Sequence, residues 1–459
     1  MNISKINDII NSQKDFLNTN SNTISSRILL LKKLLLNIKI FEDEIYEALS
    51  KDLSKAKFES FLTEILLVEK EIKLFIKNLS KWSKDKKVKA SILNFPSKNY
   101  LKPEPYGKVL IITPWNYPFQ LSLTPLIGAF SSGNTVVIKP SELAPNTSSV
   151  LNRLIRETFP ENIVSVIQGD AEVSKSLLSK KWDYIFFTGS TRVGKIVASE
   201  AAKNLTPITL ELGGKSPCII DKGINIEKAA KRIVSGKFIN CGQTCIAPDY
   251  ILVNDEIKSK FIDNLKIEII KTYGNKPNHS NDYGRIINEN HVDRLSKMIN
   301  EENIVFGGHS NKEEKYFEPT LILDPNIDSL IMSEEIFGPI LPIISYNDDR
   351  EIGKIILKNP NPLAFYIFSN NKKFINHLIN NFSFGGCVIN DTLIHYINSN
   401  LPFGGIGNSG MGAYRGKYSF DTFSHYKPIL KKQSMLDIPF RFGPYPKSFN
   451  TLKKLLSKF

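Results

Sequence analysis

The stretch "DYIFFTGSTRVGKIVASEAAKNLTPITLEL", residues 183–212, decides the fold of this chain. It begins with an apolar run typical of a buried strand, continues with a helical pattern over 191–203, and ends with a second apolar run. The same rhythm extends upstream, with strands expected at 107–115, 134–140 and 162–169 and helices at 119–133, 146–159 and 171–180. Strands that alternate with helices in this way predict a doubly wound parallel sheet, which binds ligands at the carboxyl ends of its strands.

A second alternating series follows and predicts a second α/β unit over residues 211–385. Its expected elements are a helix at 225–238 and strands at 250–254, 316–324, 339–346 and 363–369. Residues 3–80 instead carry apolar residues three and four positions apart, which indicates helices. Residues 83–101 contain few apolar residues, so we interpret them as an excursion, such as a hairpin, outside the main sheet. We expect the two α/β units to pack closely with a cleft between them.

Length and composition restrict the class of protein. The chain has 459 residues, of which 41% are hydrophobic and 23% charged, as in a globular protein of two or three compact units. The first residues lack the apolar segment of a signal peptide, and no run approaches the roughly 20 apolar residues that a membrane span requires. We therefore expect a soluble cytoplasmic protein with reduced thiols.

The formal charge of +14 raises the question of a nucleic-acid or membrane partner. The lysines are spread along the whole chain, and no nucleic-acid-binding signature accompanies them, so we expect no nucleic-acid partner. The end of the chain, 447–459, places lysines on one side of a helical pattern and apolar residues on the other, namely Leu452, Leu455, Leu456 and Phe459. We interpret this part as a solvated basic tail that can make weak contact with an anionic membrane surface.

The segment "FFTGSTRVGK", 186–195, joins a strand to a helix through Gly189, Ser190 and Thr191, with Gly194 inside the helix. A glycine allows the backbone to approach a phosphate closely, and the start of a helix offers free N–H groups and a positive dipole end. The segment therefore predicts an anion-binding turn. A helix that is merely capped after a strand is the alternative, because the usual dinucleotide and P-loop fingerprints are missing.

Glu211 lies on an apolar strand directly before the glycine pair of "TLELGGKSP", 209–217. Burial of a carboxylate raises its pKa toward the range of a general base. The alternative is a carboxylate that is paired for structural reasons.

Cys241 and Cys245 lie four residues apart in "KFINCGQTCIAPDY", 237–250. A zinc site would need further ligands at a recognisable spacing, a redox pair would read CxxC, and a disulfide conflicts with the expected compartment. One reactive thiol remains as an interpretation. Cys245 follows a glycine in a loop that can present it to a cleft, whereas Cys241 continues the helical pattern and is expected to be structural. Taken alone, an inert buried thiol is the alternative for either cysteine.

Two further segments carry polar groups near predicted turns. In "TPWNYP", 113–118, two prolines fix the turn after the first strand, and Asn116 is held there with its amide free to donate to an oxyanion. "SEEIFGP" places Glu334, Glu335 and Phe337 before a turn, and "LPFGGIGNSGMG" forms a glycine-rich loop near the end.

Taken together and in this order, these segments resemble the aldehyde dehydrogenase superfamily. The matching motifs cover residues from about 10 to 430 and are "PWNYP", "KPSE", "FTGSTRVGK", "LELGGKSP", "GQTCIAPDY", "EEIFGP" and "PFGGIGNSGMGAYRGKYSF". "GQTCIAPDY", the short N-terminus and the "GMGAYRGKYSF" ending are similar to the class 3 branch of fatty- and aromatic-aldehyde enzymes.

The resemblance implies the residues that perform the reaction. Cys245 would be the nucleophile, the Asn116 amide and the Cys245 N–H would hold the oxyanion, and Glu211 would activate the water that hydrolyses a thioester. The residues implied to hold the cofactor are Trp115, Lys139, Glu142, Gly189, Ser190, Thr191, Arg192, Val193, Gly194, Leu212, Glu335 and Phe337. No metal is implied. NAD is the expected cofactor because the Glu142 carboxylate would repel a 2′-phosphate, and NADP stays open because class 3 relatives use either.

The resemblance also implies an architecture. Residues 1–82 and 102–210 would form a Rossmann-type NAD(P)-binding domain and 211–385 an α/β catalytic domain. Residues 83–101 and 386–430 would form a bridging element of a homodimer, and 431–459 the basic tail. The expected reaction is NAD(P)-dependent oxidation of a medium- or long-chain aliphatic or an aromatic aldehyde to its acid, with Tyr117, Ile246 and Phe403 along the entry funnel. A coenzyme A-acylating relative and a catalytically silent binding protein of the same fold are the alternatives.

Overall fold

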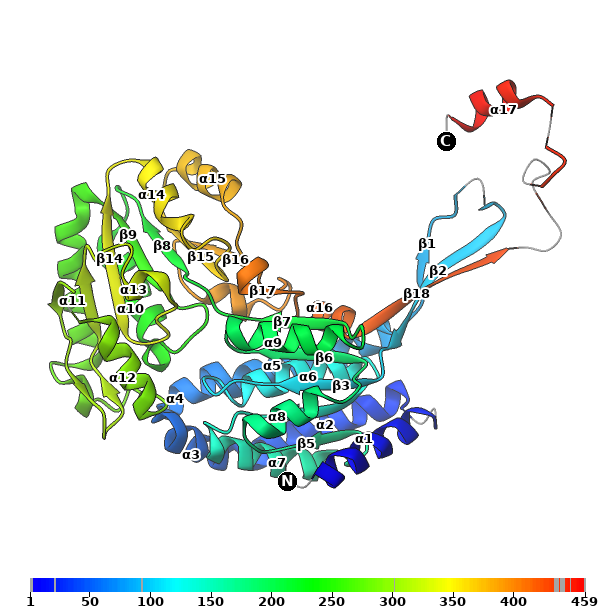
Figure 1. Cartoon of the computed structure of the whole chain (residues 1–459), viewed down its shortest axis with the longest axis horizontal. Coiled ribbons are helices and arrows are strands. Elements are labelled where there is room, and N and C mark those ends of the chain that lie inside the picture. Colours follow the sequence, from blue (N-terminus) through cyan, green and yellow to red (C-terminus); the bar gives the residue numbers. More distant parts are fainter. Residues whose placement is uncertain are drawn as a thin grey trace.

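The computed structural model describes residues 3–19, 22–91, 94–300, 302–432, 437, 442–445 and 447–457. Two α/β bodies lie side by side, and a thin three-stranded arm projects from one of them (Figure 1). The first body holds the segment 183–212 with which the sequence analysis began. The doubly wound α/β architecture expected from the alternating pattern is therefore present.

The first body is built on a six-stranded sheet with the order β17-β7-β6-β3-β4-β5. Its strands are β3 (Lys108–Ile112), β4 (Thr135–Lys139), β5 (Val164–Val166), β6 (Tyr184–Thr188), β7 (Ile208–Glu211) and β17 (Gly410–Met411). All neighbours are parallel except β17, which runs antiparallel to β7. The chain leaves β3 toward β4 on one side and returns at β6 on the other, so the strand order switches between β3 and β6. Ligands bind at such a switch point in open α/β sheets.

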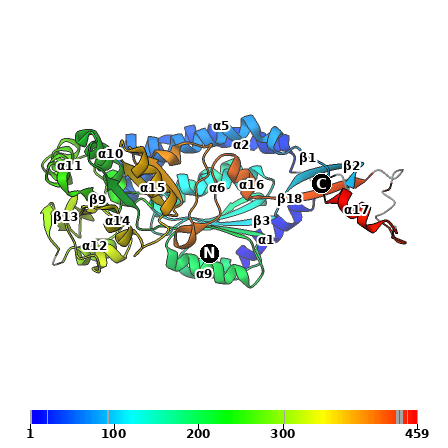
Figure 2. The same ribbon diagram turned by 90° about the horizontal axis from the view of Figure 1, so that it is seen from above.

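Helices cover both faces of this sheet (Figure 2). One face carries α2 (Ile24–Ile40), α5 (Leu66–Trp82), α6 (Gln120–Ser131) and α7 (Pro145–Thr158), and the other carries α1 (Ile3–Leu17), α8 (Ala171–Leu178) and α9 (Thr191–Ala202). Every residue of α6 is buried, because α6 lies between the sheet and the outer helices α2 and α5. An apolar surface all round a helix is typical of such a position.

The N-terminal helices continue toward the second body. They are α3 (Glu42–Leu53), α4 (Lys57–Ser60) and the π-helical turn Phe61–Ile65, which leads directly into α5. The prediction of helices over 3–80 is confirmed.

The second body is built on a seven-stranded sheet with the order β10-β13-β14-β9-β8-β15-β16. Its strands are β8 (Pro217–Ile220), β9 (Tyr250–Asn254), β10 (Ile304–Phe306), β13 (Thr320–Leu323), β14 (Ile340–Tyr346), β15 (Ala364–Phe368) and β16 (Gly386–Ile389). Only β10 is antiparallel to its neighbour. Its helices are α10 (Ile226–Phe238), α11 (Lys258–Tyr273), α12 (Glu289–Met298), α13 (Leu330–Ser333), α14 (Asp349–Ile356) and α15 (Lys372–Asn381), and a small pair is formed by β11 (Ser310–Asn311) and β12 (Tyr316–Phe317).

The arm is a three-stranded antiparallel sheet with the order β1-β2-β18, formed by β1 (Lys86–Val88), β2 (Ser97–Pro105) and β18 (Ser424–Lys432). The pairing of β2 with β18 extends from Ser97 opposite Lys432 to Pro105 opposite Ser424. The expected excursion at 83–101 is thus antiparallel, but β2 continues beyond residue 101 to Pro105. Helices α16 (Lys417–Thr422) and α17 (Phe449–Leu456) precede and follow β18.

Residues 386–430 do not form one bridging element, which corrects the expected boundary. β16 extends the second sheet beside β15, β17 pairs with β7 in the first sheet, and only β18 belongs to the arm. The segment passes between three sheets because its short strands find their partners far away in the sequence. Hydrophobic periodicity alone does not reveal such partners.

Cys241 does not continue the helix of residues 226–238, which corrects a second expectation. α10 ends at Phe238, and Asn240, Cys241 and Gly242 then adopt φ values of 52°, 53° and 72°. A left-handed backbone of this kind ends a right-handed helix. Cys241 is nevertheless fully buried, as expected for a structural cysteine.

Among the described residues, no helix is long and apolar enough to cross a membrane. The basic tail forms α17, in which Leu452 is half-buried. Phe459 and the side chain of Leu455, which the expected apolar face includes, lie outside the described part of the chain.

Candidate active site

The candidate site lies where the two sheets meet end to end. Asn116 and Gly189 follow β3 and β6, and Glu211 ends β7, so all three stand at the carboxyl edge of the first sheet. Cys245 precedes β9, and Glu335 precedes β14, so they stand at the amino edge of the second sheet. The carboxyl ends of one sheet thus face the amino ends of the other, and the motif residues converge there.

Two cavities meet at this place. The first has a volume of about 430 Å³ and is lined by most of the residues singled out from the motifs, including Trp115, Asn116, Gly189, Ser190, Thr191, Arg192, Glu211, Leu212, Glu335 and Phe337. The second has a volume of about 420 Å³ and mostly apolar walls. Cys245 and Leu121 line both cavities. The thiol therefore stands at the junction of a polar and an apolar chamber.

The Cys245 side chain is half-buried, and desolvation is the main cause that raises its pKa. The carboxylates of Glu335 and Glu211 raise this pKa further, and the backbone N–H groups of Cys245 and Ile246, which donate to the sulfur, oppose them. The thiol is therefore neutral in this arrangement, and its deprotonation requires a base or a nearby positive charge.

Asn116 is buried, and its amide donates to the carbonyl of Gln243 at 3.0 Å. Gln243 lies two residues before Cys245, so this bond connects the loop after β3 to the loop that carries the thiol. The amide nitrogen has a second hydrogen, and Asn116 lines the polar cavity together with Cys245. The geometry thus suits a donor to an oxygen that develops charge beside the sulfur.

Glu211 is 2% exposed, and neither of its carboxylate oxygens has a hydrogen-bond partner among the residues that the structure describes. Desolvation raises its pKa well above the ordinary value. A structural carboxylate would be paired, so the alternative of a paired carboxylate finds no support here. A buried carboxyl group with free oxygens beside a cavity matches a proton acceptor for water.

Glu335 lies against the glycine pair of residues 213 and 214. A Cβ atom at Gly213 would stand 1.9 Å from the Glu335 Oε2 atom, and the Gly214 N–H donates to this carboxylate. Burial, followed by the charge of Asp249, raises the pKa of Glu335 to about 8. In this arrangement position 213 therefore accommodates glycine only, because the Glu335 carboxylate occupies the space that a Cβ atom would need.

Phe337 adopts a φ of 47° and packs edge-to-face on Trp115, with ring centroids 5.3 Å apart. These two rings come from the two bodies and form one wall of the polar cavity. The fold therefore brings Trp115 and Phe337, which lie far apart in the sequence, to the same wall of the cavity.

The turn after β6 is both a capped helix start and part of the cavity. Ser190 caps α9 by accepting from the Val193 N–H, and the turn residues 189–192 line the polar cavity. Val193 packs on the apolar core and Gly194 packs on Leu212, where a Cβ would come within 2.7 Å of Leu212 Cδ2. Val193 and Gly194 therefore pack against the core on the far side of the turn and do not line the cavity.

Lys139 and Glu142 form an ion pair of 2.6 Å at the carboxyl end of β4. Lys139 is buried, Glu142 is exposed, and neither lines the polar cavity. They stand at the same sheet edge as Asn116, Gly189 and Glu211, at the end of the neighbouring strand β4.

Two cavity residues were missed in the sequence. His291 packs edge-to-face on Trp115 at 5.3 Å, and burial lowers its pKa to about 4. Arg294 donates to the Ile336 carbonyl at 2.6 Å and lines the cavity beside Glu335. Both lie on α12, which carries no motif, so no local signal in the sequence indicates their role.

The apolar cavity contains Tyr117, Ile246 and Phe403, as expected for the entry funnel. The N-terminal helices supply Leu62, Leu66 and Leu67, and the late segment supplies Leu393, Tyr396 and Ile397. The only charged residue in this lining is Lys70. The chamber next to the thiol thus accepts a largely apolar molecule.

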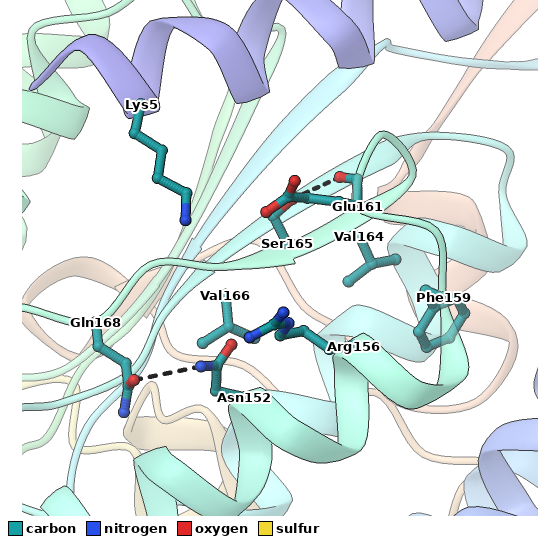
Figure 3. A pocket seen from close by; sticks show the side chains of 9 residues that line it. All are labelled: Lys5, Asn152, Arg156, Phe159, Glu161, Val164, Ser165, Val166 and Gln168. Atoms are coloured by element: carbon teal, nitrogen blue, oxygen red, sulfur yellow. Dashed lines mark hydrogen bonds between the residues drawn. The ribbon is translucent and has the colours of Figure 1, made fainter. Parts of the chain in front are cut away.

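A separate hollow of about 480 Å³ lies at the edge strand β5 (Figure 3). Lys5 points into it from α1, and Asn152 donates to Gln168 at its other side. It contains none of the motif residues, so it is distinct from the candidate site. Across the described ranges, no cluster of His, Cys, Asp and Glu side chains could hold a metal ion.

Comparison with known protein families identifies the family of this chain. Residues 4–429 match the model of the aldehyde dehydrogenase family. The chain belongs to the aldehyde dehydrogenase family.

Its relatives include a 4,4'-diaponeurosporen-aldehyde dehydrogenase of Staphylococcus aureus, which is 50% identical over 443 residues and is matched over 96% of each chain. An aldehyde dehydrogenase family 3 member H1 of Arabidopsis thaliana is 45% identical, with 94% of this chain and 90% of that protein covered. The resemblance to the class 3 branch is thereby confirmed.

A solved structure described as the substrate-bound state of Staphylococcus aureus AldH superimposes with a TM-score of 0.96 at 49% identity. The match covers 99% of this chain and 100% of that one. The protein is therefore an NAD(P)-dependent aldehyde dehydrogenase that oxidises an aldehyde to its carboxylic acid.

Proposed function

We propose that Cys245 is the nucleophile for oxidation of a long or bulky apolar aldehyde. The observation that carries this proposal is the position of Cys245, which is shared by the apolar chamber and by the chamber lined by Glu211 and Glu335. An aldehyde that enters the apolar chamber would meet the sulfur, and a nicotinamide held in the other chamber would supply the hydride acceptor for the same carbon.

In the first step the Cys245 thiol gives its proton to water in the polar chamber, the thiolate sulfur adds to the aldehyde carbon, and the electron pair of the carbonyl bond moves to oxygen. The Asn116 amide and the Cys245 N–H stabilise the resulting oxyanion of the thiohemiacetal. A bound nicotinamide would supply the acceptor for the hydride of this carbon, and loss of that hydride would leave the C=O bond of a thioester on Cys245.

In the second step water attacks the thioester carbon, and Glu211 accepts its proton. The C–S bond then breaks, the sulfur leaves as thiolate, and the acid is released. Because Glu211 is buried without a partner, its carboxylate binds a proton more readily than an exposed glutamate would.

The polar chamber fits a dinucleotide. The turn at Gly189 to Arg192 offers the N-terminus of α9 to a pyrophosphate, and Arg192 adds a positive charge beside it. Glu335, held by the Gly214 N–H, is placed to accept from ribose hydroxyls, with Trp115, Leu212 and Phe337 as apolar neighbours. Lys139 and Glu142 would reach the adenosine ribose at the same sheet edge.

We propose NAD as the preferred cofactor, with NADP also accepted. The Glu142 carboxylate disfavours a 2′-phosphate by charge repulsion, but Lys139 already pairs with it at 2.6 Å and weakens this repulsion. Solved structures of the same fold, each 26% identical, are described as an NAD-dependent aldehyde dehydrogenase of Sinorhizobium meliloti and as a glyceraldehyde-3-phosphate dehydrogenase of Methanocaldococcus jannaschii complexed with NADP.

The apolar chamber supports a medium- or long-chain aliphatic, aromatic or polyene aldehyde as substrate. Its walls are aliphatic and aromatic, and the name of the Staphylococcus aureus relative states a carotenoid-derived aldehyde for that protein. Burial of each additional methylene stabilises a bound chain by about 0.8 kcal/mol, so kcat/KM is expected to rise with chain length until the chamber is filled.

The decisive experiment compares wild-type protein with Cys245→Ala in an absorbance assay of the reduced nicotinamide, using aldehydes of increasing length and both cofactors. We expect turnover to disappear in the variant, because no other thiol lines the two chambers, while NAD binding is retained. Cys387→Ala, which alters a half-buried cysteine outside the site, is the matched control and should keep full activity. Turnover by Cys245→Ala at the wild-type rate would remove the proposed nucleophile.

We further propose that the arm of β1, β2 and β18 bridges two copies of the chain in a homodimer, since β1 and β18 are edge strands with exposed side chains.

The four described cysteines are all free, which supports a reducing, cytoplasmic setting. The lysines of α17 support weak contact with anionic membrane surfaces, which cosedimentation with anionic vesicles would detect.

A further inference from the structure

A buried ion pair lies behind the candidate site, in a place that the proposed reaction does not use. Lys55 and Glu64 come from the N-terminal helical segment, and their side chains are fully shielded from solvent with a Nζ–Oε1 distance of 2.6 Å. Burial of two charges is costly, and an apolar pair of similar size often stabilises a fold as well or better. What two charges can do and an apolar pair cannot is to orient neighbouring groups through hydrogen bonds.

The Lys55 amino group makes two further contacts, and both are to the loop after β3. It donates to the Asn116 carbonyl at 3.2 Å and lies 4.2 Å from the centroid of the Tyr117 ring. Lys55 thus holds the main chain of the residue whose side-chain amide faces Cys245.

Glu64 holds the other end of the same loop. Its Oε2 atom accepts from the Gln120 N–H at 2.8 Å, where α6 begins, while Oε1 accepts from Lys55. Glu64 reaches this position from the π-helical turn Phe61–Ile65. Such turns recur at functional sites because they shift side chains relative to an α-helix. The pair therefore clamps the loop 116–120 at both ends.

The loop that carries the thiol joins the same network. The Asn240 amide donates to the Asn116 carbonyl at 2.8 Å and to the Gln243 carbonyl at 3.2 Å, and the Asn116 amide donates to the Gln243 carbonyl at 3.0 Å. The Asn116 carbonyl thus accepts from both Lys55 and Asn240. The orientation of the Asn116 amide relative to Cys245 depends on these two donors.

We propose that the Lys55–Glu64 ion pair is a positioning device for oxyanion stabilisation: it fixes the Asn116 main chain so that the Asn116 amide faces the carbon attacked by Cys245. This inference rests on the proposed role of Asn116. Lys55 and Glu64 line neither chamber at the thiol, so they are positioning residues and act through Asn116.

The test is a cycle of variants measured by kcat, aldehyde KM and NAD affinity. Lys55→Met/Glu64→Leu removes both charges of the pair together and keeps apolar volume. Burial already raises the pKa of the neighbouring Glu59 to about 7 and the charge of Lys55 opposes this rise, so Glu59 is expected to be neutral in the variant. Loss of one oxyanion donor lowers kcat by about 100- to 1,000-fold, so we expect Asn116→Ala to fall in this range. We expect the apolar double variant to lower kcat by about 10- to 100-fold, since misplacement of a catalytic group by about 1 Å has this effect. KM and NAD affinity should stay nearly unchanged.

The decisive result is whether the losses in kcat caused by the two sets of substitutions are additive. The triple variant combines Lys55→Met, Glu64→Leu and Asn116→Ala. If the ion pair acts through Asn116, this variant should have the same kcat as Asn116→Ala alone. Lys55→Arg, which keeps a donor and a charge, should recover part of the lost rate. Lys73→Met/Glu69→Leu, which removes an exposed ion pair of the same 2.6 Å length on the same helical segment, is the matched control and should keep the wild-type kcat.

Each outcome has one meaning. If Asn116→Ala keeps the wild-type kcat, the proposed oxyanion role fails and the positioning inference fails with it. If Asn116→Ala is impaired but the apolar double variant is not, or if the two losses multiply in the triple variant, only the positioning inference is overturned. If the double variant does not fold, Glu64→Gln, which keeps an acceptor for the Gln120 N–H, enters the same cycle with the same criterion.

Discussion

Glu211 shows how a single residue couples folding to chemistry. Its carboxyl group is buried with both oxygens unpartnered among the described residues, so the charged form is disfavoured and its pKa is raised. A base acts only in its deprotonated form. The same burial that makes Glu211 a stronger base therefore keeps it neutral until the pH is high.

This gives a prediction for Glu211→Gln. The variant should still form the thioester but hydrolyse it about 100- to 10,000-fold more slowly, because no general base remains. Rapid mixing should show a burst of reduced nicotinamide followed by a stalled steady state. In wild-type protein the hydrolysis rate should rise with pH above neutrality and in Glu211→Gln this rise should vanish. A steady-state rate equal to that of the wild type would exclude Glu211 as the base.

The same residue predicts a pH effect on stability. The folded-state pKa of Glu211 is raised above the unfolded value, so the unfolded chain loses this proton first as the pH rises. Wild-type stability should therefore fall with increasing pH between the unfolded and the folded pKa, and this contribution should be absent in Glu211→Gln. Thermal melts at several pH values would measure it.

At the scale of elements, the short connection between β7 and β8 links the two bodies and carries the glycine pair at 213 and 214. Gly213 has no room for a Cβ atom, because the Glu335 carboxylate occupies that space. The colliding atom is the end of a flexible side chain, so the protein can respond by moving Glu335 and need not move its backbone.

Gly213→Ala should therefore fold normally but displace Glu335 from the polar chamber. Loss of a hydrogen bond that leaves a buried partner unsatisfied costs about 1–3 kcal/mol, so we expect NAD affinity to fall by roughly tenfold or more, as in Glu335→Gln. Gly353→Ala, in helix α14, meets no atom closer than 3.8 Å and is the control. Titration with the reduced cofactor, followed by its nicotinamide fluorescence, would measure the affinity of both variants. Wild-type affinity in Gly213→Ala would argue against a role of Glu335 in cofactor binding.

At the scale of the whole molecule, the arm stands apart from both bodies (Figure 1). Most side chains of its outer strand β18 are exposed, and Leu430 is 50% exposed. The edge strands of an isolated three-stranded sheet present backbone N–H and C=O groups with which a strand of another chain can pair.

If the arm bridges a homodimer, Leu430→Asp should shift the protein toward monomer by inserting a charge into the interface. Leu357→Asp, at a leucine that is 66% exposed on the second body, should leave the mass unchanged. Light scattering coupled to size exclusion would measure both variants. A monomeric wild-type protein, or a dimer unaffected by Leu430→Asp, would contradict the bridging role.

The sequence by itself determined the regular part of the protein. The alternation of apolar strands and amphipathic helices over 107–212 predicted β3 to β7 and α6 to α9, because this periodicity is a local property of the chain. The motifs around Asn116, Glu211, Cys245 and Glu335 were found for a similar reason: each is a short run whose residues act close to one turn.

Only the tertiary structure decided the rest. Short strands such as β16 and β17 belong to different sheets according to partners far along the chain, and Cys241 leaves the helical pattern through a left-handed backbone that packing imposes. His291, Arg294, Lys55 and Glu64 reach the site from helices without motifs. Local periodicity fixes which segments are strands and helices, whereas the contacts that assemble a site join distant residues, and their free energy exists only in the folded chain.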